Sequence, residues 1–238
     1  MKTLQKFSGF AALYMAAAHL IGIVIFLVVL DYPSITDPAQ KLAMNIEKQT
    51  VIFSTNLLMY VFFGVFLIVL SLALYDRLKS GAPAIMQVAT AIGIIWAGLL
   101  IASGMVSNAG LATVVPLYTK DPAQAALTWQ GIEAVANGLG NANGEILGGM
   151  WTMLISLAAL RTSGLPKALN ILGLFVGTVG LVTILPALND LTGIFGMGQI
   201  IWFVGLGTVL LRSDPRTERL PVLMLSANNI LSPAHGRP

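Results

Sequence analysis

Apolar residues gather in six long segments of the chain, and polar residues are concentrated between them. A helix needs roughly 20 apolar residues to cross a bilayer core of about 30 Å. Six segments meet that requirement, at residues 7–30, 51–75, 84–106, 141–160, 168–188 and 192–211. Open strands would leave backbone groups unpaired in lipid, and the alternating segments of a barrel are not visible. The pattern predicts an all-α fold: an integral membrane six-helix bundle at 1–212, followed by a polar cytoplasmic tail at 213–238.

The basic residues indicate how this bundle is oriented. Ten of the 13 Lys and Arg residues lie on one side of the predicted spans: Lys2, Lys6, Arg77, Lys79, Arg161, Lys167, Arg212, Arg216, Arg219 and Arg237. The other side holds Lys41, Lys48 and Lys120. Because basic residues are retained on the cytoplasmic side of a membrane, we expect both termini to face the cytoplasm.

A short polar motif occurs twice and indicates an internal repeat. Asp37-Pro38-Ala39-Gln40 recurs as Asp121-Pro122-Ala123-Gln124. With an offset of 85 residues, Asn56 aligns with Asn141 and Ser71 with Ser156, and a Ser-Gly-x-Pro turn follows both stretches. Self-similarity of this kind predicts repeated helical hairpins that run in the same sense.

The repeated motif is typical of a helix start. Asp37 and Asp121 suit the N-cap position, with Pro at the first helical position and Gln at the third, so we expect structural caps. A continuous helix from Pro38 to Tyr75 would be about 57 Å long, which exceeds the bilayer core. We expect that segment to project outside or to break, and we expect the same of the segment that begins at Pro122.

Composition narrows the chemistry that the chain can support. Of its 238 residues, 56% are hydrophobic and 10% are charged, which is typical neither of a soluble domain nor of a disordered chain. The chain has no cysteine and two histidines, which excludes disulfides, thiolate metal sites and iron–sulfur clusters. Haem would need axial ligands, and one histidine within the spans and scattered methionines are weak candidates for them. The predicted helices carry no basic face that would favour nucleic-acid binding. We therefore expect no metal and no cofactor.

Ionisable side chains inside a span are costly, so each one marks a candidate site. Glu145 and His19 are the two residues of this kind, and we expect both to lie between the midplane and the outer interface. Amide side chains at similar depth complete the candidate ligand site: Asn56, Asn141 and Gln199. A spacing of four residues further predicts one helix stripe, formed by Glu133, Asn137, Asn141, Glu145 and Gly149. Together, the ionisable and amide side chains at this depth predict a polar pocket that opens outward.

Three interpretations of Glu145 remain open at this point. It is a protonated, hydrogen-bonded structural group, or it binds a ligand, cation or proton from the external side, or it acts as a general acid or base. His19 is either a hydrogen-bonded core residue or a partner of Glu145. The sequence contains no hydrolase elbow, metalloprotease motif or phosphate-binding loop, which argues against an enzyme.

The first part of the chain carries a family resemblance. It depends on Gly9-Phe10-Ala11-Ala12-Leu13-Tyr14, on Leu20-Ile21-Gly22, and on Asp31-Tyr32-Pro33-Ser34-Ile35-Thr36-Asp37-Pro38. With these motifs the chain resembles a bacterial family of multi-pass membrane proteins known only as a domain of unknown function, nearly throughout its length to Leu211. The resemblance implies a six-helix protein of the bacterial cytoplasmic (inner) membrane, and it implies no activity and no site residue.

Two functional hypotheses follow. The first is binding or transport of a small molecule, lipid or cation at an outward-facing polar pocket. The alternative is a non-catalytic accessory or scaffold subunit of a membrane complex, with a membrane-protein partner or a second copy of the chain. The lipid bilayer is the one partner that both hypotheses require.

Overall fold

The computed structural model describes residues 2–140 and 145–212, and all regular elements in these ranges are helical. The α-helices are α1 (Lys2–Ile23), α2 (Pro38–Glu47), α3 (Gln49–Asn56), α4 (Phe63–Leu78), α5 (Pro83–Tyr118), α6 (Pro122–Gly140), α7 (Ile146–Thr162), α8 (Lys167–Val182) and α9 (Thr192–Arg212). Two π-helical segments are η1 (Val24–Val29) and η3 (Leu57–Phe62), and two 3₁₀-helices are η2 (Tyr32–Ser34) and η4 (Pro186–Leu191).

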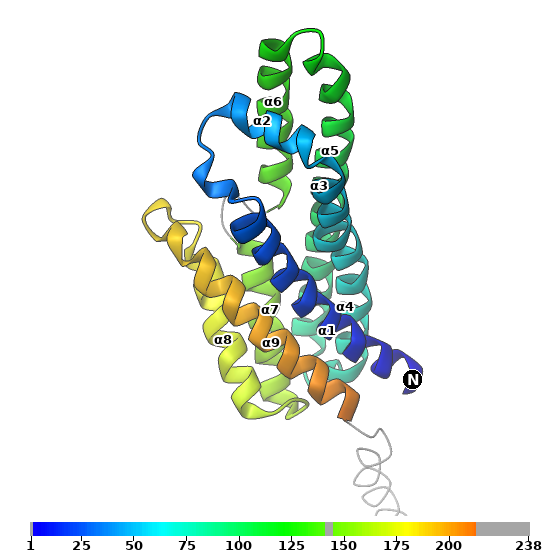
Figure 1. Cartoon of the computed structure of the whole chain (residues 1–238). Helices are drawn as coiled ribbons and strands as arrows, with labels where there is room; N and C mark the ends of the chain where they lie inside the picture. Colours follow the sequence, from blue (N-terminus) through cyan, green and yellow to red (C-terminus); the bar gives the residue numbers. More distant parts are fainter. Residues whose placement is uncertain (1, 141–144, 213–238) are drawn as a thin grey trace, which may run out of the picture.

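Six of the described helices form a closed ring. Helix α1 packs on α4, α4 on α5, α5 on α7, α7 on α8, α8 on α9, and α9 returns to α1 (Figure 1). Four helical runs are long and apolar enough to cross a membrane: Gln5–Val29, Gln49–Leu78, Pro83–Tyr118 and Pro186–Arg212. Helices α7 and α8 are apolar but shorter. The chain is a membrane protein with several apolar helices.

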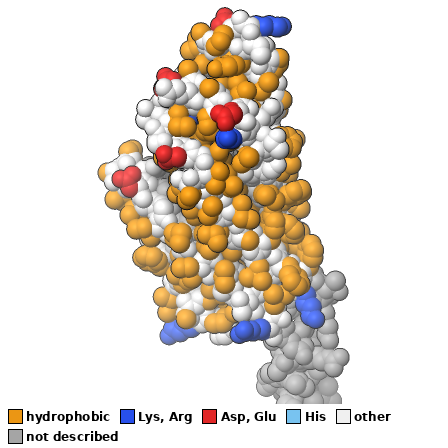
Figure 2. Space-filling view, viewed as in Figure 1, with side chains coloured by type: hydrophobic (Ala, Val, Ile, Leu, Met, Phe, Trp, Pro, Cys, Tyr) orange, Lys and Arg blue, Asp and Glu red, His pale blue; other side chains and the backbone are white. Residues whose placement is uncertain are grey.

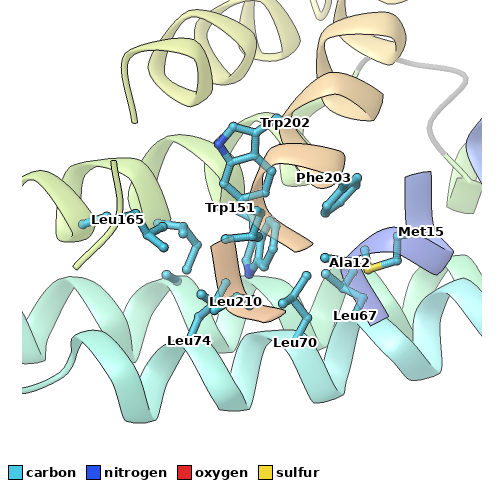
Figure 3. Packing of buried hydrophobic residues seen from close by; sticks show 14 of the residues in the cluster. Ala12, Met15, Leu67, Leu70, Leu74, Trp151, Leu165, Trp202, Phe203 and Leu210 are labelled. Atoms are coloured by element: carbon cyan, nitrogen blue, oxygen red, sulfur yellow. The ribbon is translucent and has the colours of Figure 1, made fainter. Parts of the chain in front are cut away.

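Aromatic side chains fill the middle of the ring. Trp151 contacts Trp96 at 6.1 Å and Trp202 at 5.7 Å between ring centroids, and Phe203 packs beside them. Figure 3 shows Trp151, Trp202 and Phe203 above a row of leucines on α4. The ring is therefore closed by a packed core along this part of its axis and is not an open pore.

A second, smaller core lies beyond the ring, where α5 extends past its neighbours. Helix α5 has 36 residues, or about 54 Å, so its second half projects from the ring and pairs with α6. Helix α2 crosses this pair, as Figure 1 shows at the top. Leu42 of α2, Val114 of α5 and Trp129 of α6 are among its buried residues.

Both long segments predicted to project or break are interrupted. The run from Pro38 breaks at Lys48, whose backbone dihedrals of −98° and 23° separate α2 from α3. The described part of α6 ends at Gly140, and α7 begins at Ile146. Glu145 precedes α7 with dihedrals of −85° and 47°, which are not helical. The predicted single helix stripe from Glu133 through Glu145 is therefore wrong, because Glu145 itself is not helical.

One packing arrangement occurs twice in the ring. Gly93 of α5 lies against Ser71 of α4 and Trp151 of α7, while Gly173 of α8 lies against Ser156 of α7 and Trp202 of α9. In both cases a serine, a glycine and a tryptophan come from three successive ring helices. The glycine lets the indole approach, because a side chain there would occupy the same space.

The predicted tail at 213–238 lies outside the described residues.

Candidate functional site

Two adjoining cavities lie between the aromatic core and the projecting helices. The inner cavity, of about 370 Å³, is the one lined by Glu145 and His19. The outer cavity, of about 230 Å³, is the one lined by Asn45 and Trp129. Leu27 and Tyr60 line both cavities, so the two are neighbours.

The π-helical segments supply this shared wall. Leu27 belongs to η1 and Tyr60 to η3, and both segments interrupt helices that are otherwise apolar and regular. A π-turn leaves a backbone carbonyl without its usual partner, and here Tyr14 donates its hydroxyl to the Leu58 carbonyl at 2.9 Å. Such turns occur frequently at functional sites. The irregular backbone thus lies where the cavities are.

Glu145 is held at the edge of the inner cavity through its backbone. Its N–H donates to Thr183 Oγ1 at 2.8 Å, and that hydroxyl donates to the Gly180 carbonyl at 2.6 Å. Within residues 2–140 and 145–212, no group donates a hydrogen bond to the Glu145 carboxylate or forms an ion pair with it. The carboxylate is therefore positioned in the cavity wall with its acceptors unused by the described chain.

His19 lines the same cavity from α1. Its ring packs edge-on against Phe63 with centroids 5.0 Å apart, and Phe63 in turn meets Trp96. Nδ1 of His19 is buried, and no side chain in the described part of the chain forms a hydrogen bond with it. The structure thus brings the two predicted ionisable residues to one cavity, although no hydrogen bond joins them.

Two of the three predicted amide residues, Asn56 and Gln199, do not join Glu145. Asn56 lines the outer cavity, where its Nδ2 donates to Ser107 Oγ at 3.0 Å and to Asn108 Oδ1 at 2.9 Å. Gln199 is fully buried and lines neither cavity; its Nε2 donates to Thr152 Oγ1 at 2.9 Å, which links α9 to α7. Asn141 lies outside the described residues. Of the five residues predicted for one pocket, the structure thus places Glu145 and His19 in the inner cavity and Asn56 in the outer one.

Asp37 and Asp121 lie at the starts of α2 and α6. Asp37 Oδ2 accepts a hydrogen bond from the Gln40 N–H at 2.8 Å, and Asp121 Oδ1 accepts one from the Gln124 N–H at 2.9 Å. Each bond satisfies one of the free donors at a helix start. Both helices of the projecting part therefore begin with the same local structure.

The outer cavity contains a polar network that the sequence did not reveal. Tyr32 donates its hydroxyl to Glu133 Oε1 at 2.6 Å, and Lys41 pairs with the same oxygen at 3.3 Å. Burial, together with the adjacent Glu133 carboxylate, raises the pKa of the Tyr32 hydroxyl, so it remains a donor at neutral pH. Tyr32 and Glu133 are 101 residues apart, so the sequence pattern did not predict that they meet. The predicted polar stripe included Glu133 but neither of its partners.

The described residues contain no group of three His, Asp or Glu side chains that could hold a metal ion. The two cavities differ in character instead. The inner one combines one carboxylate and one imidazole with apolar and aromatic walls. The outer one is lined by amides, hydroxyls and the Glu133 carboxylate, which pairs with Lys41. Each arrangement suits noncovalent binding of a small molecule.

Comparison with known proteins gives one family. Neither the curated proteins nor the solved structures contain a match to this chain. A family model described as a domain of unknown function (DUF4386) matches residues 7–197. That range includes all residues that line the two cavities and most of the apolar helices. The chain belongs to the DUF4386 family, in agreement with the resemblance seen in its first loop.

Proposed function

We propose that this protein crosses the bacterial cytoplasmic membrane six times, with both termini inside, and binds a small, largely apolar organic cation in its inner cavity. The six ring helices would be the spans. Figure 2 supports the orientation, since only Lys and Arg side chains appear at the lower end of this face, whereas the acidic side chains, with further Lys or Arg side chains among them, lie toward the projecting helices. Because basic residues are retained on the cytoplasmic side, this orientation would put the cavities toward the outside.

The observation that carries the ligand proposal is the Glu145 carboxylate. A carboxylate removed from water is costly unless it is paired, and no described residue pairs with this one. Among the described residues, no Lys or Arg lines the inner cavity. A cationic ligand would supply the missing partner.

The walls of the inner cavity favour an apolar body for that cation. Tyr60, Phe63 and Trp96 contribute aromatic rings, and Met59 and Met197 contribute thioethers. Cations are attracted to the faces of aromatic rings, most strongly to indole, and methionine adapts to irregular apolar shapes. The volume of about 370 Å³ falls within the usual range for small-molecule sites.

The test uses two probes of equal shape. Benzyltrimethylammonium carries the positive charge, and neopentylbenzene is its neutral isostere. Native mass spectrometry of the full chain in lipid nanodiscs would measure the binding of each probe to wild type, Glu145→Gln and Glu47→Gln. Glu47 is a surface carboxylate that pairs with Lys48, so it is the matched control.

We expect the cation to bind wild type and Glu47→Gln, and to bind Glu145→Gln about tenfold more weakly, since the charge interaction is lost. The neutral isostere should bind all three proteins weakly and equally. Equal binding of the cation to wild type and Glu145→Gln would overturn the proposal. A stoichiometric protein partner retained by all variants, with no probe bound, would instead favour an accessory-subunit role.

A further inference from the structure

The inner cavity reaches the surface on one side of the ring. Its wall on α4 and α5 is closed, because Phe63, Trp96 and Leu100 line it and are buried. Leu27 of η1 and Met197 of α9 also line the cavity, and each of these two side chains is 52% exposed. Since exposed lining residues mark the place where a cavity meets the surface, the opening lies between η1 and the start of α9.

Helix packing and two glycines account for this opening. Helix α1 packs closely on α9, whereas η1, which continues α1, has at most a weak contact with α9 among the described elements. Gly193 and Gly196 of α9 line the cavity, and a Cβ atom on either would meet no described atom within 4 Å. The missing side chains thus leave free space at the point where the two helices stop touching.

The opening faces lipid and not water. Its two sides belong to the apolar runs Gln5–Val29 and Pro186–Arg212, both long enough to cross a membrane. The neighbouring exposed side chains include Val24 and Val28 of η1 and Ile194 of α9. Figure 2 shows hydrophobic side chains across the middle of this face and charged ones toward its two ends. In the proposed topology, the opening lies in the outer leaflet, because η1 ends the first span and α9 begins the last.

The charges around the opening suit a cation. Inside the cavity, the Glu145 carboxylate has no partner among the described residues. Outside it, Asp31 follows η1 and Asp190 precedes α9, and both are exposed. The two apolar stretches themselves, 7–30 and 191–211, contain no Lys or Arg. Carboxylates of one sign around an apolar entrance attract positive charge toward it.

We propose that the cation of the inner cavity is a single-chain amphiphile, with its head beside Glu145 and its alkyl chain extending through the opening into the outer leaflet. This inference rests on the proposed function and specifies its ligand as a membrane-dissolved compound. Lipid tails are as apolar as a leucine side chain, so the alkyl chain can stay among them while the head is bound. The ligand therefore enters in the plane of the membrane, between η1 and α9.

The test is photo-cross-linking of the full chain in lipid nanodiscs. The probe is dodecyltrimethylammonium with a diazirine midway along its chain, and mass spectrometry identifies the labelled peptides with and without excess benzyltrimethylammonium. Gly196→Leu adds a side chain in the opening. Gly98→Leu is the matched control, because Gly98 also has nothing within 4 Å of an added Cβ atom and lines neither cavity. Thermal unfolding would establish that each variant is folded.

We expect the probe to label η1 and the first half of α9 in wild type, and we expect excess benzyltrimethylammonium to abolish this labelling. The displaceable labelling should fall about tenfold in Glu145→Gln, because the charge interaction with the head is lost. It should fall about fivefold in Gly196→Leu, because the new side chain occupies the path of the alkyl chain. Gly98→Leu should be labelled like wild type.

Three results would overturn the inference. One is labelling spread over the lipid-facing helices that the competitor does not displace, which means partition into the bilayer only. Another is displaceable labelling on helices other than η1 and α9, and the third is equal labelling of Gly196→Leu and Gly98→Leu. In each case the proposed function would stand if benzyltrimethylammonium still bound in a way that depends on Glu145. Failure of both cations to bind would overturn both proposals.

Discussion

At the scale of single residues, polar groups in the projecting part are satisfied by partners far away in the sequence. Tyr32 and Glu133 are 101 residues apart, and Asn56 and Asn108 are 52 residues apart. Each such bond fixes an element near the N-terminus against α5 or α6. The network therefore holds the outer cavity in shape, and its strength should depend on the protonation of its members.

Tyr32 makes this dependence testable. Because its pKa is raised above the ordinary value of 10.0, the folded protein keeps the hydroxyl proton at a pH where the unfolded chain loses it. The stabilisation is complete below that ordinary value and is lost as the pH rises from it toward the raised one. We expect the thermal unfolding temperature of wild type to fall as the pH is raised through this range, more steeply than that of Tyr32→Phe.

At neutral pH, the difference in stability between wild type and Tyr32→Phe gives a second test. Tyr32→Phe should be less stable by about 1–2 kcal/mol, because a hydrogen bond to a carboxylate is lost. The difference between the two proteins should then shrink at alkaline pH. Parallel curves for wild type and variant across the series would contradict this role for Tyr32.

At the scale of elements, close helix contacts depend on particular glycines. A Cβ atom on Gly149 would lie 2.8 Å from the Gly177 carbonyl and 2.9 Å from the Leu181 nitrogen, so α7 and α8 meet backbone to backbone. Gly98 of α5, in contrast, has nothing within 4 Å of such an atom. The two glycines therefore differ in what an added methyl group would meet.

We expect Gly149→Ala to destabilise the protein by about 1–3 kcal/mol, since backbone atoms cannot move aside as a flexible side chain would. Gly98→Ala, the matched control, should leave stability nearly unchanged or raise it slightly, because Ala has the higher helix propensity. Thermal unfolding of the detergent-solubilised proteins would measure both. Equal stability of the two variants would mean that α7 and α8 are packed less closely than described.

At the scale of the whole molecule, the two ends of the ring differ. The Ser-Gly-x-Pro turns lie together at one end, where Arg77 donates to the Gly164 carbonyl at 3.1 Å and Gly81 lies against Thr162. The projecting helices lie toward the other end (Figure 1). The outer cavity is lined by residues of α2, α3 and α6 there, and the inner cavity adjoins it. Access to the cavities thus depends on which end faces outward.

Cysteine labelling would establish that orientation, because the natural chain has no cysteine that would give background. Lys120→Cys lies between α5 and α6, and Lys167→Cys lies at the start of α8. A membrane-impermeant maleimide applied to spheroplasts should label the first and should label the second only after permeabilisation. The reverse pattern would invert the proposed topology and place both cavities on the cytoplasmic side.

Local features of the molecule could be predicted from the sequence because they depend on neighbouring residues. Apolar length identifies helices that can lie in a membrane, and Asp-Pro-x-Gln places the starts of α2 and α6. The length of the run from Pro38 likewise required a break or a projection. Composition and residue order are enough for such statements, since burial in lipid and helix capping act within one helix.

Only the tertiary structure decided which polar residues share a site. Asn56 and Gln199 have the depth expected for a common pocket with Glu145, yet one lines the outer cavity and the other links α7 to α9. Depth along a helix is set by sequence position, but the direction of a side chain depends on how each helix turns against its neighbours. The π-helical turns and the non-helical backbone of Glu145 change that direction, and the tertiary packing brings His19 and Glu145 to one cavity.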